Sequence, residues 1–238
     1  RLEAWAGAYP PVRTPKRVLV VMAGNIPLVG FFDLLCVLAS GHACRVKPSS
    51  KDTVLIGYVV DLLRTIDPAI PLRMAEQGER PDAVIATGSD NANRYFRMLF
   101  GGIPSLLRGS RQSVAVLSGR ETAAELSGLE EDIFSYSGLG CRNVSLLFLP
   151  RGYLPELRCT ALNEKYRRNY LRERALLRMR RMPFVDLDGA VLCEDRSFPA
   201  ALSRIHYTFY DSLADVEAWL AAHDDRLQCV VSQCVRHS

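Results

Sequence analysis

The chain has 238 residues, 48% hydrophobic and 24% charged, a composition typical of a globular protein with one large or two modest domains. No apolar run approaches the ~20 residues that cross a membrane, and the first residues lack the order of a signal peptide. The chain has no initiating Met, so we expect a fragment or a processed chain. Seven cysteines without CxxC spacing argue against zinc or a disulfide framework and favour a reducing cytoplasm.

Strands and helices are predicted to alternate along the first half of the chain. We expect strands at Arg17–Gly24, Ala43–Lys47, Asp82–Ser89 and Gln112–Gly119. The intervening helices are expected at 27–40, at 49–66 with Ser49 as the cap, and at 90–102. This order indicates an α/β protein, with parallel strand–helix–strand units and helices on both faces of the sheet.

The second half begins near Ser113, where we place a domain boundary. A helix over 120–137 leads into a glycine-rich turn that contains Cys141, and a strand over 143–150 follows. Further elements are expected as a basic helix at 164–182, strands at 189–195, 204–211 and 227–232, and a helix at 213–223.

The basic segment Glu164–Met182 holds much of the chain's net charge of +4. Such a helix can contact nucleic acid or anionic lipid, but a solvated helix face is the interpretation we favour.

Three predicted strands end in polar, small-residue sequences, at the edge where open α/β sheets bind ligands. Asn25 can donate an amide hydrogen bond, or it merely closes a turn. Lys47 can reach a phosphate or ribose, or it belongs to a solvated turn. Gly88 and Ser89 can present N–H groups to phosphate, or they form a plain helix cap. GxGxxG is absent, so a Rossmann fingerprint is not claimed.

Cys141 is the candidate nucleophile, because Gly138 and Gly140 allow the backbone to approach a substrate and the Cys141 N–H can donate to an oxyanion. The histidines share no spacing with Cys141, so no Cys–His pair is predicted. A structural cysteine is the alternative. The other six cysteines are interpreted as core or surface residues.

Four blocks together resemble the LuxC-like acyl-CoA reductases of the aldehyde dehydrogenase superfamily: "MAGNIPLVGFFDLLCVLASGHACRVKPSSKD", "AVIATGSDNANRYFRMLFG", "RGSRQSVAVLSG" and "DIFSYSGLGCRNVSLLFLPRGY". The resemblance is strong over 17–153 and thinner to about Ser232. It implies an aldehyde-dehydrogenase-like fold, with a dinucleotide-binding domain at 1–112 and a catalytic domain at 113–238, each incomplete at its outer end. The segment that closes the family's active site has no equivalent here.

The same resemblance implies NADPH-dependent reduction of a long-chain fatty acyl thioester to an aldehyde. Cys141 matches the nucleophile that takes the acyl group, and Asn25 matches the oxyanion-hole amide. The positions that match cofactor contacts are Lys47 and Ser49 at the ribose and Gly88 and Ser89 near the pyrophosphate. The glycines then leave space for the acyl group and the nicotinamide on either side of the sulfur.

Two local departures from the wider superfamily have chemical consequences. The stretch "LLRGSRQSVAVL" has no carboxylate where relatives that oxidise aldehydes carry the Glu that activates water, which protects an acyl-cysteine from hydrolysis. Ser50 and Lys51 stand where many NAD-dependent relatives place a Glu on the ribose, which favours the 2′-phosphate of NADPH.

The expected acyl donor is a fatty acyl-CoA or an acylated carrier protein. Arg108, Arg111 and Lys51 either favour a phosphorylated carrier or are plain surface charge. A homo-oligomer or an acyl-transfer partner subunit is possible, and neither nucleic acid nor a membrane span is expected. The alternatives are an acyltransferase or thioesterase that uses the same cysteine without hydride transfer, and a non-catalytic, truncated nucleotide-binding remnant.

Overall fold

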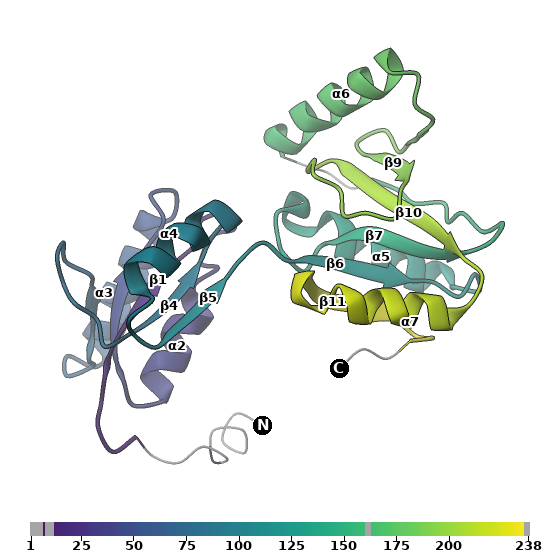
Figure 1. The fold of residues 1–238 in the computed structure, drawn as a ribbon. Coiled ribbons are helices and arrows are strands. Elements are labelled where there is room, and N and C mark those ends of the chain that lie inside the picture. Colours follow the sequence, from purple (N-terminus) through teal and green to yellow (C-terminus); the bar gives the residue numbers. More distant parts are fainter. Residues whose placement is uncertain (1–6, 8–11, 160–162, 236–238) are drawn as a thin grey trace. The chain divides into compact units, whose positions relative to one another are not determined.

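A computed structural model of the chain describes Gly7 and residues 12–159 and 163–235. The chain forms two compact units that divide between Ser110 and Arg111, and each is built around its own parallel sheet (Figure 1). The boundary expected from the sequence lies between residues 112 and 113.

The first unit contains a five-stranded, fully parallel sheet in the order β3-β2-β1-β4-β5. Its strands are β1 (Arg17–Val21), β2 (Ala43–Lys47), β3 (Leu72–Met74), β4 (Ala83–Thr87) and β5 (Ser105–Arg108). Its helices are α2 (Phe31–Ala39), α3 (Thr53–Ile66) and α4 (Asp90–Phe100). The short strands β3 and β5 were not predicted.

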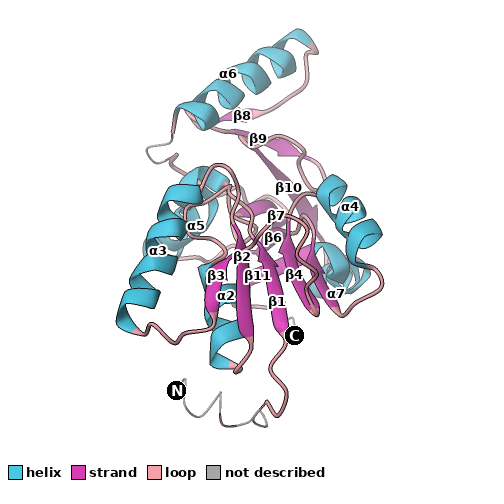
Figure 2. Cartoon of the chain, turned by 90° about the vertical axis from the view of Figure 1, so that its left-hand side faces the viewer, coloured by secondary structure: helices cyan, strands magenta, loops and turns pink. Residues whose placement is uncertain are grey.

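Helices cover both faces of this sheet, as predicted (Figure 2). Leu34 of α2 and Ile56 of α3 pack with Val20 of β1 on one face, and all three side chains are fully buried. Phe96 of α4 packs with Val84 on the other face. Alternate residues of a strand point to opposite faces, so β-branched runs such as "RVLVV" suit a sheet that is covered on both sides.

The second unit contains a six-stranded sheet in the order β11-β6-β7-β10-β9-β8, parallel except for the pairing of β8 with β9. Its strands are β6 (Gln112–Val116), β7 (Val144–Pro150), β8 (Val185–Asp186), β9 (Val191–Glu194), β10 (Arg204–Tyr210) and β11 (Leu227–Ser232). Its α-helices are α5 (Ala123–Phe134), α6 (Glu164–Met179) and α7 (Leu213–Ala222), and the 3₁₀ turns are η1 (Ser135–Gly138) and η2 (Asp224–Arg226). Side chains of α5 and α7 pack in separate apolar cores.

The structure corrects the bounds of several predicted helices, and the helix predicted over 27–40 is α2, which begins only at Phe31. Helix α3 begins at Thr53 with Asp52 as its N-cap residue, so Ser49 does not cap it. The predicted helix over 120–137 is shorter at both ends: α5 starts after Thr122, which forms a capping box with Glu125. It ends at Phe134, because Tyr136, Ser137 and Gly138 all have positive φ and cannot continue a right-handed helix.

Candidate functional site

The cysteine turn connects α5 to β7 and carries Cys141 on its exposed side. Tyr136, Ser137 and Gly138 have φ values of 52°, 55° and 63°, so three successive left-handed residues reverse the chain. The hydroxyl of Ser113, a buried residue of β6, donates to the Cys141 carbonyl at 2.9 Å. The backbone of Cys141 itself is therefore tied to the sheet, while its side chain is exposed.

Asn143 fixes the geometry of the cysteine turn, and the sequence analysis did not identify it. Its Oδ1 accepts from the Gly140 N–H at 2.8 Å, and its Nδ2 donates to the carbonyls of Asp132 and Ser135, both at 3.0 Å. One side chain thus satisfies the N–H of the residue before the cysteine and two carbonyls at the end of α5. The sequence did contain a signal for this role, because Asn143 follows the candidate nucleophile by two residues in a glycine-rich turn.

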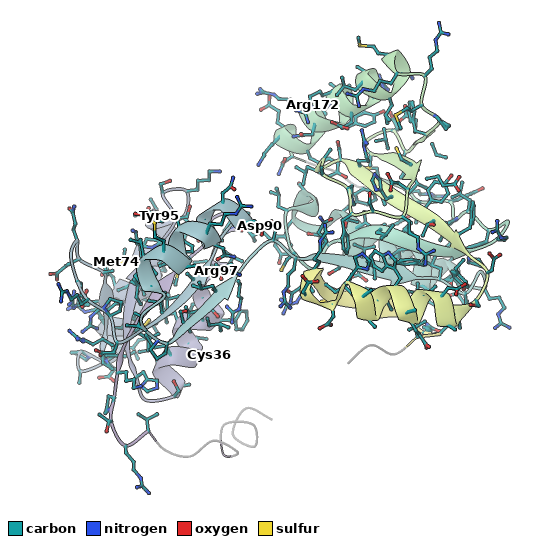
Figure 3. The ribbon with its side chains drawn as sticks, viewed as in Figure 1. Cys36, Met74, Asp90, Tyr95, Arg97 and Arg172 are labelled. Carbon is teal, nitrogen blue, oxygen red and sulfur yellow. The ribbon has the colours of Figure 1, made fainter. Side chains whose placement is uncertain are left out.

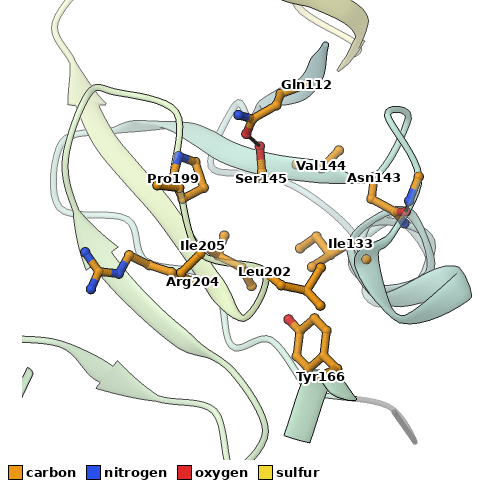
Figure 4. A pocket seen from close by; sticks show the side chains of 14 residues that line it. Gln112, Ile133, Asn143, Val144, Ser145, Tyr166, Pro199, Leu202, Arg204 and Ile205 are labelled. Atoms are coloured by element: carbon orange, nitrogen blue, oxygen red, sulfur yellow. Dashed lines mark hydrogen bonds between the residues drawn. The ribbon is translucent and has the colours of Figure 1, made fainter. Parts of the chain in front are cut away.

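A cavity of about 150 Å³ opens beside the cysteine turn within the second unit (Figure 4). Gly138, Gly140 and Asn143 line it from the turn. Apolar groups on the remaining wall come from Ile133, Val144, Tyr166, Pro199, Leu202 and Ile205, and the side chain of Arg204 also lines it. Ser145 donates to the side-chain oxygen of Gln112 at 2.8 Å, and these two residues with Arg204 and Asn143 make the lining part polar and part apolar.

Gly138 is required at its position for two reasons. Its φ of +63° is disfavoured for residues with a side chain, and an added Cβ would lie 3.2 Å from a ring carbon of Tyr166. Tyr166 is fully buried and belongs to the first turn of α6. The residue before that helix, Asn163, also donates its N–H to the Ser137 hydroxyl at 3.1 Å. The start of α6 and the cysteine turn therefore pack directly on each other.

Of the other six cysteines, all of them in the described part of the chain, Cys36 is exposed like Cys141, two are buried, and Cys159, Cys229 and Cys234 are half-buried. Cys44 and Cys193 are buried, and Cys36 is exposed on α2. Burial raises the pKa of the Cys44 thiol to about 12 and that of the partly buried Cys159 thiol to about 11. These two thiols are poor nucleophiles near neutral pH, since the thiolate is the reactive form.

Asn25 lies exposed in the turn that follows β1 in the first unit. Three residues later, Leu28 has a φ of 58°, and its N–H donates to the Asp52 carboxylate at 2.7 Å. The Asp52 side chain is buried, and this bond joins the Asn25 loop to the loop that follows β2. Asp52 is a further residue that the sequence analysis missed as a site component, because its partner is 24 positions away.

A second cavity, of about 190 Å³, lies within the first unit and is lined by Lys47 at the end of β2. Its other lining residues are Leu19, Arg45, Ala75, Glu76, Gln77, Gly78, Glu79, Pro81 and Phe100. Glu79 accepts from Arg45 at 3.0 Å and from Arg73 at 2.8 Å, and its pKa is lowered by hydrogen bonds that outweigh its desolvation. Three cations (Lys47, Arg45 and Arg73) and two carboxylates (Glu76 and Glu79) thus lie around this cavity. The excess of positive charge suits a phosphorylated ligand.

The other predicted cofactor residues follow the strands β2 and β4 of the first unit. Ser49 packs against Gly24, where an added Cβ would come within 2.3 Å of the hydroxyl oxygen, and Ser50 and Lys51 are exposed beside it. The Gly88 N–H donates to the Arg108 carbonyl at 3.1 Å and continues the β4–β5 ladder. Ser89 caps α4 by accepting from the Ala92 N–H at 3.3 Å. A ligand role for these residues remains a prediction.

The candidate carrier-binding arginines have contacts within their own unit. Arg108 forms an ion pair with Asp33 at 2.6 Å, and Arg111 donates to the Leu227 carbonyl at 3.3 Å. In residues 12–159 and 163–235 there is no cluster of three or more His, Cys, Asp or Glu side chains that could hold a metal ion. No helix of the described residues is long and apolar enough to span a membrane.

No protein-family model matches the sequence. No curated protein matches it either. Solved structures do match the fold. An enzyme from Burkholderia cenocepacia assigned as an aldehyde dehydrogenase superposes with a TM-score of 0.68 at 18% identity, covering 93% of this chain and 63% of its own.

Two further matches are aldehyde dehydrogenases. The enzyme from Mycobacterium tuberculosis, complexed with NAD⁺, has a TM-score of 0.67 at 15% identity and covers 91% of this chain and 60% of its own. An acetylating aldehyde dehydrogenase from Geobacillus thermoglucosidasius has a TM-score of 0.62 at 10% identity, and the match covers 92% of this chain and 60% of that enzyme. This chain therefore has a partial aldehyde dehydrogenase fold, and it spans less than two thirds of the length of these structures.

Proposed function

We propose that this chain acts like the LuxC-like acyl-CoA reductases and reduces a long-chain fatty acyl thioester to the fatty aldehyde with NADPH. The observation that carries the proposal is the exposed Cys141, held on a hydrogen-bonded turn beside a partly apolar cavity, in a chain with a partial aldehyde dehydrogenase fold. A soluble, cytoplasmic setting belongs to the same proposal.

In the first step the Cys141 sulfur attacks the thioester carbonyl carbon. A new sulfur–carbon bond forms, the bond to the donor's sulfur breaks, and the donor thiolate leaves with the proton released by Cys141. The Cys141 N–H and the Asn25 amide are the proposed donors to the oxyanion that develops on the carbonyl oxygen. Bound nicotinamide would supply the hydride that, with one proton, converts the acyl-cysteine into aldehyde and free thiol.

The cavity beside the turn suits the start of an acyl chain. Ile133, Val144, Leu202 and Ile205 present apolar surface, and buried apolar area is stabilised by roughly 25 cal/mol per Å². A dry cavity of comparable size holds a ligand of roughly six carbon atoms. A long chain therefore has room for its first carbons there, and its remainder must lie outside.

The cavity that contains Lys47 suits the phosphorylated end of the cofactor. Two cations, Arg45 and Arg73, already pair with the two carboxylates Glu79 and Glu76, so Lys47 and the exposed Lys51 keep their charge available. A 2′-phosphate adds negative charge at the ribose, and this balance supports NADPH over NADH.

Intact-protein mass spectrometry tests the first step. The chain is mixed with a long-chain acyl-CoA without nucleotide, beside Cys141→Ala and the control Cys36→Ala, which removes another exposed thiol. We expect one acyl adduct on the unmodified chain and on the control, and none on Cys141→Ala. Absence of the adduct on a folded chain would overturn the proposal and favour a nucleotide-binding remnant.

The second step is tested by adding NADPH or NADH to the acylated protein and trapping aldehyde with a hydrazine reagent. Aldehyde release that is faster with NADPH is the expected result. Release of free CoA or fatty acid without aldehyde would instead identify an acyltransferase or a thioesterase. Lys51→Ala is expected to weaken NADPH binding more than NADH binding, with Lys16→Ala as the control for an exposed lysine elsewhere in the first unit.

A further inference from the structure

The positive charge of this chain is concentrated on one helix. The segment Glu164–Met182, α6 and the three residues after it, contains eight of the 30 Lys and Arg residues and two of the 26 Asp and Glu residues. It therefore carries a net charge of +6, while the rest of the chain carries −2. Such an asymmetry produces a local positive potential on a chain that is otherwise slightly acidic.

Helix α6 turns its apolar side inward and its cations outward. Tyr166, Tyr170, Glu173 and Leu177 are buried at spacings of three and four residues. Lys165, Arg168 and Arg172 follow the opposite side with the same spacing, and Figure 3 shows Arg172 on α6. Three exposed apolar residues lie among these cations: Leu171, Met179 and Met182. Arg and Met are enriched in protein–protein interfaces.

About half of these cations are engaged within the chain. Arg168 pairs with Glu164, Arg172 with Glu173 at 3.1 Å, and both Arg174 and Arg178 with Asp186, at 3.5 and 3.9 Å. Among the residues that the structure describes, the others have no carboxylate within 4.0 Å: Lys165, Arg167, Arg180 and Arg181. They remain available to a partner's acidic groups.

This basic surface begins next to the candidate nucleophile. Tyr166 contacts Gly138 of the cysteine turn, and Asn163, the N-cap residue of α6, bonds Ser137 of the same turn. A molecule bound along α6 from Lys165 onward would thus lie beside the loop that presents Cys141, within one compact unit.

We infer that the outward side of α6 is a docking surface for an acidic protein that carries the acyl group as a thioester. The inference rests on the proposed function, since it identifies the donor for Cys141. Sixteen helical residues extend about 24 Å, so one nucleotide diphosphate would engage only a part of the charge. The neighbouring carboxylates Glu164 and Asp186 would repel a polyphosphate backbone but alternate well with the mixed charges of a protein surface.

A lipid surface fits this helix less well. The apolar residues at helical spacing on α6, Tyr170 and Leu177 among them, are buried in the protein core, and the exposed apolar side chains are scattered among the cations. Most of these cations are Arg, whose planar guanidinium donates two parallel hydrogen bonds to one carboxylate. This geometry suits Asp and Glu side chains on a protein.

The test uses the double variant Lys165→Glu/Arg167→Glu. Both residues lie in the first turn and a half of α6, where carboxylates are favourable to a helix, so the fold should be kept. The matched control is Arg64→Glu/Arg94→Glu, which changes charge equally on α3 and α4. The probes are an acylated holo-acyl carrier protein, which is small and acidic, and the same acyl group on CoA.

Binding is measured first, by anisotropy of the labelled carrier protein with each charge variant in a Cys141→Ala background. We expect the double variant to weaken binding by about tenfold or more at low salt, and the control by less than about twofold. Affinity of the unmutated surface should fall as salt is raised. This binding result stands even if Cys141 proves unreactive, so failure of the docking surface and of the proposed chemistry are distinguishable.

Acylation of Cys141 is then followed by mass spectrometry with both donors. The expected result is a slower reaction of the double variant with the carrier protein and an unchanged reaction with acyl-CoA. Equal slowing with both donors, or no effect on carrier binding, would overturn the inference. So would binding to vesicles containing phosphatidylglycerol, or to single-stranded DNA, that exceeds binding to the carrier and is lost in the double variant.

Discussion

Replacing Asn143 by Ala should loosen the cysteine turn. The substitution removes an acceptor from the Gly140 N–H and two donors from the carbonyls of Asp132 and Ser135. A single hydrogen bond within a protein contributes about 0.5–1.5 kcal/mol net, so three predict a loss of roughly 1.5–4.5 kcal/mol in the free energy of unfolding. Water can reach part of this turn, which places the expected value toward the lower end of that range.

Urea denaturation followed by fluorescence measures the change, with Asn169→Ala as the control. Asn169 makes one side-chain bond, to the Lys165 carbonyl on the surface of α6, so that variant should lose about 0.5–1.5 kcal/mol at most. Asn143→Asp keeps the acceptor for Gly140 but turns a carboxylate oxygen toward the two carbonyls. It should therefore be as unstable as the Ala variant.

Hydrogen exchange gives a local measure of the same effect. The Gly140 amide should exchange faster in Asn143→Ala under conditions in which the protein stays folded, and acylation of Cys141 should slow because the thiol is less well positioned. A variant with unfolding free energy within about 0.5 kcal/mol of the unmodified chain and an unchanged Gly140 exchange rate would refute this account.

Three other predictions follow from the same structure. Gly138→Ala should lower the unfolding free energy by roughly 1–2 kcal/mol, because Gly138 has a φ of +63°. The control Gly128→Ala lies inside α5, where an added Cβ meets open space, and it should raise the unfolding free energy by about 0.5–1 kcal/mol. Equal effects of the two variants in thermal unfolding would contradict the turn geometry. Asp52→Ala leaves the Leu28 N–H without its partner and should lower both stability and NADPH affinity. Asp52→Asn retains an acceptor and should restore most of both. Equal NADPH affinities of the two variants in calorimetric titration would argue against a role of the Asp52–Leu28 hydrogen bond in cofactor binding. Burial lowers the pKa of His206 below its ordinary 6.5, so the folded state disfavours the protonated ring and stability should fall as pH drops through 6.5 and below. His206→Gln should flatten that part of a plot of unfolding free energy against pH, and an unchanged slope would disprove the assignment.

The sequence by itself determined the main strands and helices and the place of the cysteine turn. These features depend on local patterns: β-branched apolar runs for β1, β6 and β7, apolar residues at helical spacing for α3, and Gly138 and Gly140 around Cys141. The alternation of strand and helix in the first half of the chain was enough to predict a parallel sheet covered on both faces, and the structure confirms it for the first unit.

Only the tertiary structure decided the strand order, the cavities and the residues that support the turn. Strands β3, β5 and β8 have two to four residues, too few for a periodic pattern, and they exist because a longer neighbour supplies their hydrogen bonds. Asn143 and Asp52 are ordinary polar residues in the sequence. Their importance comes from backbone groups at positions 132, 135 and 28, and only folding brings those groups within reach.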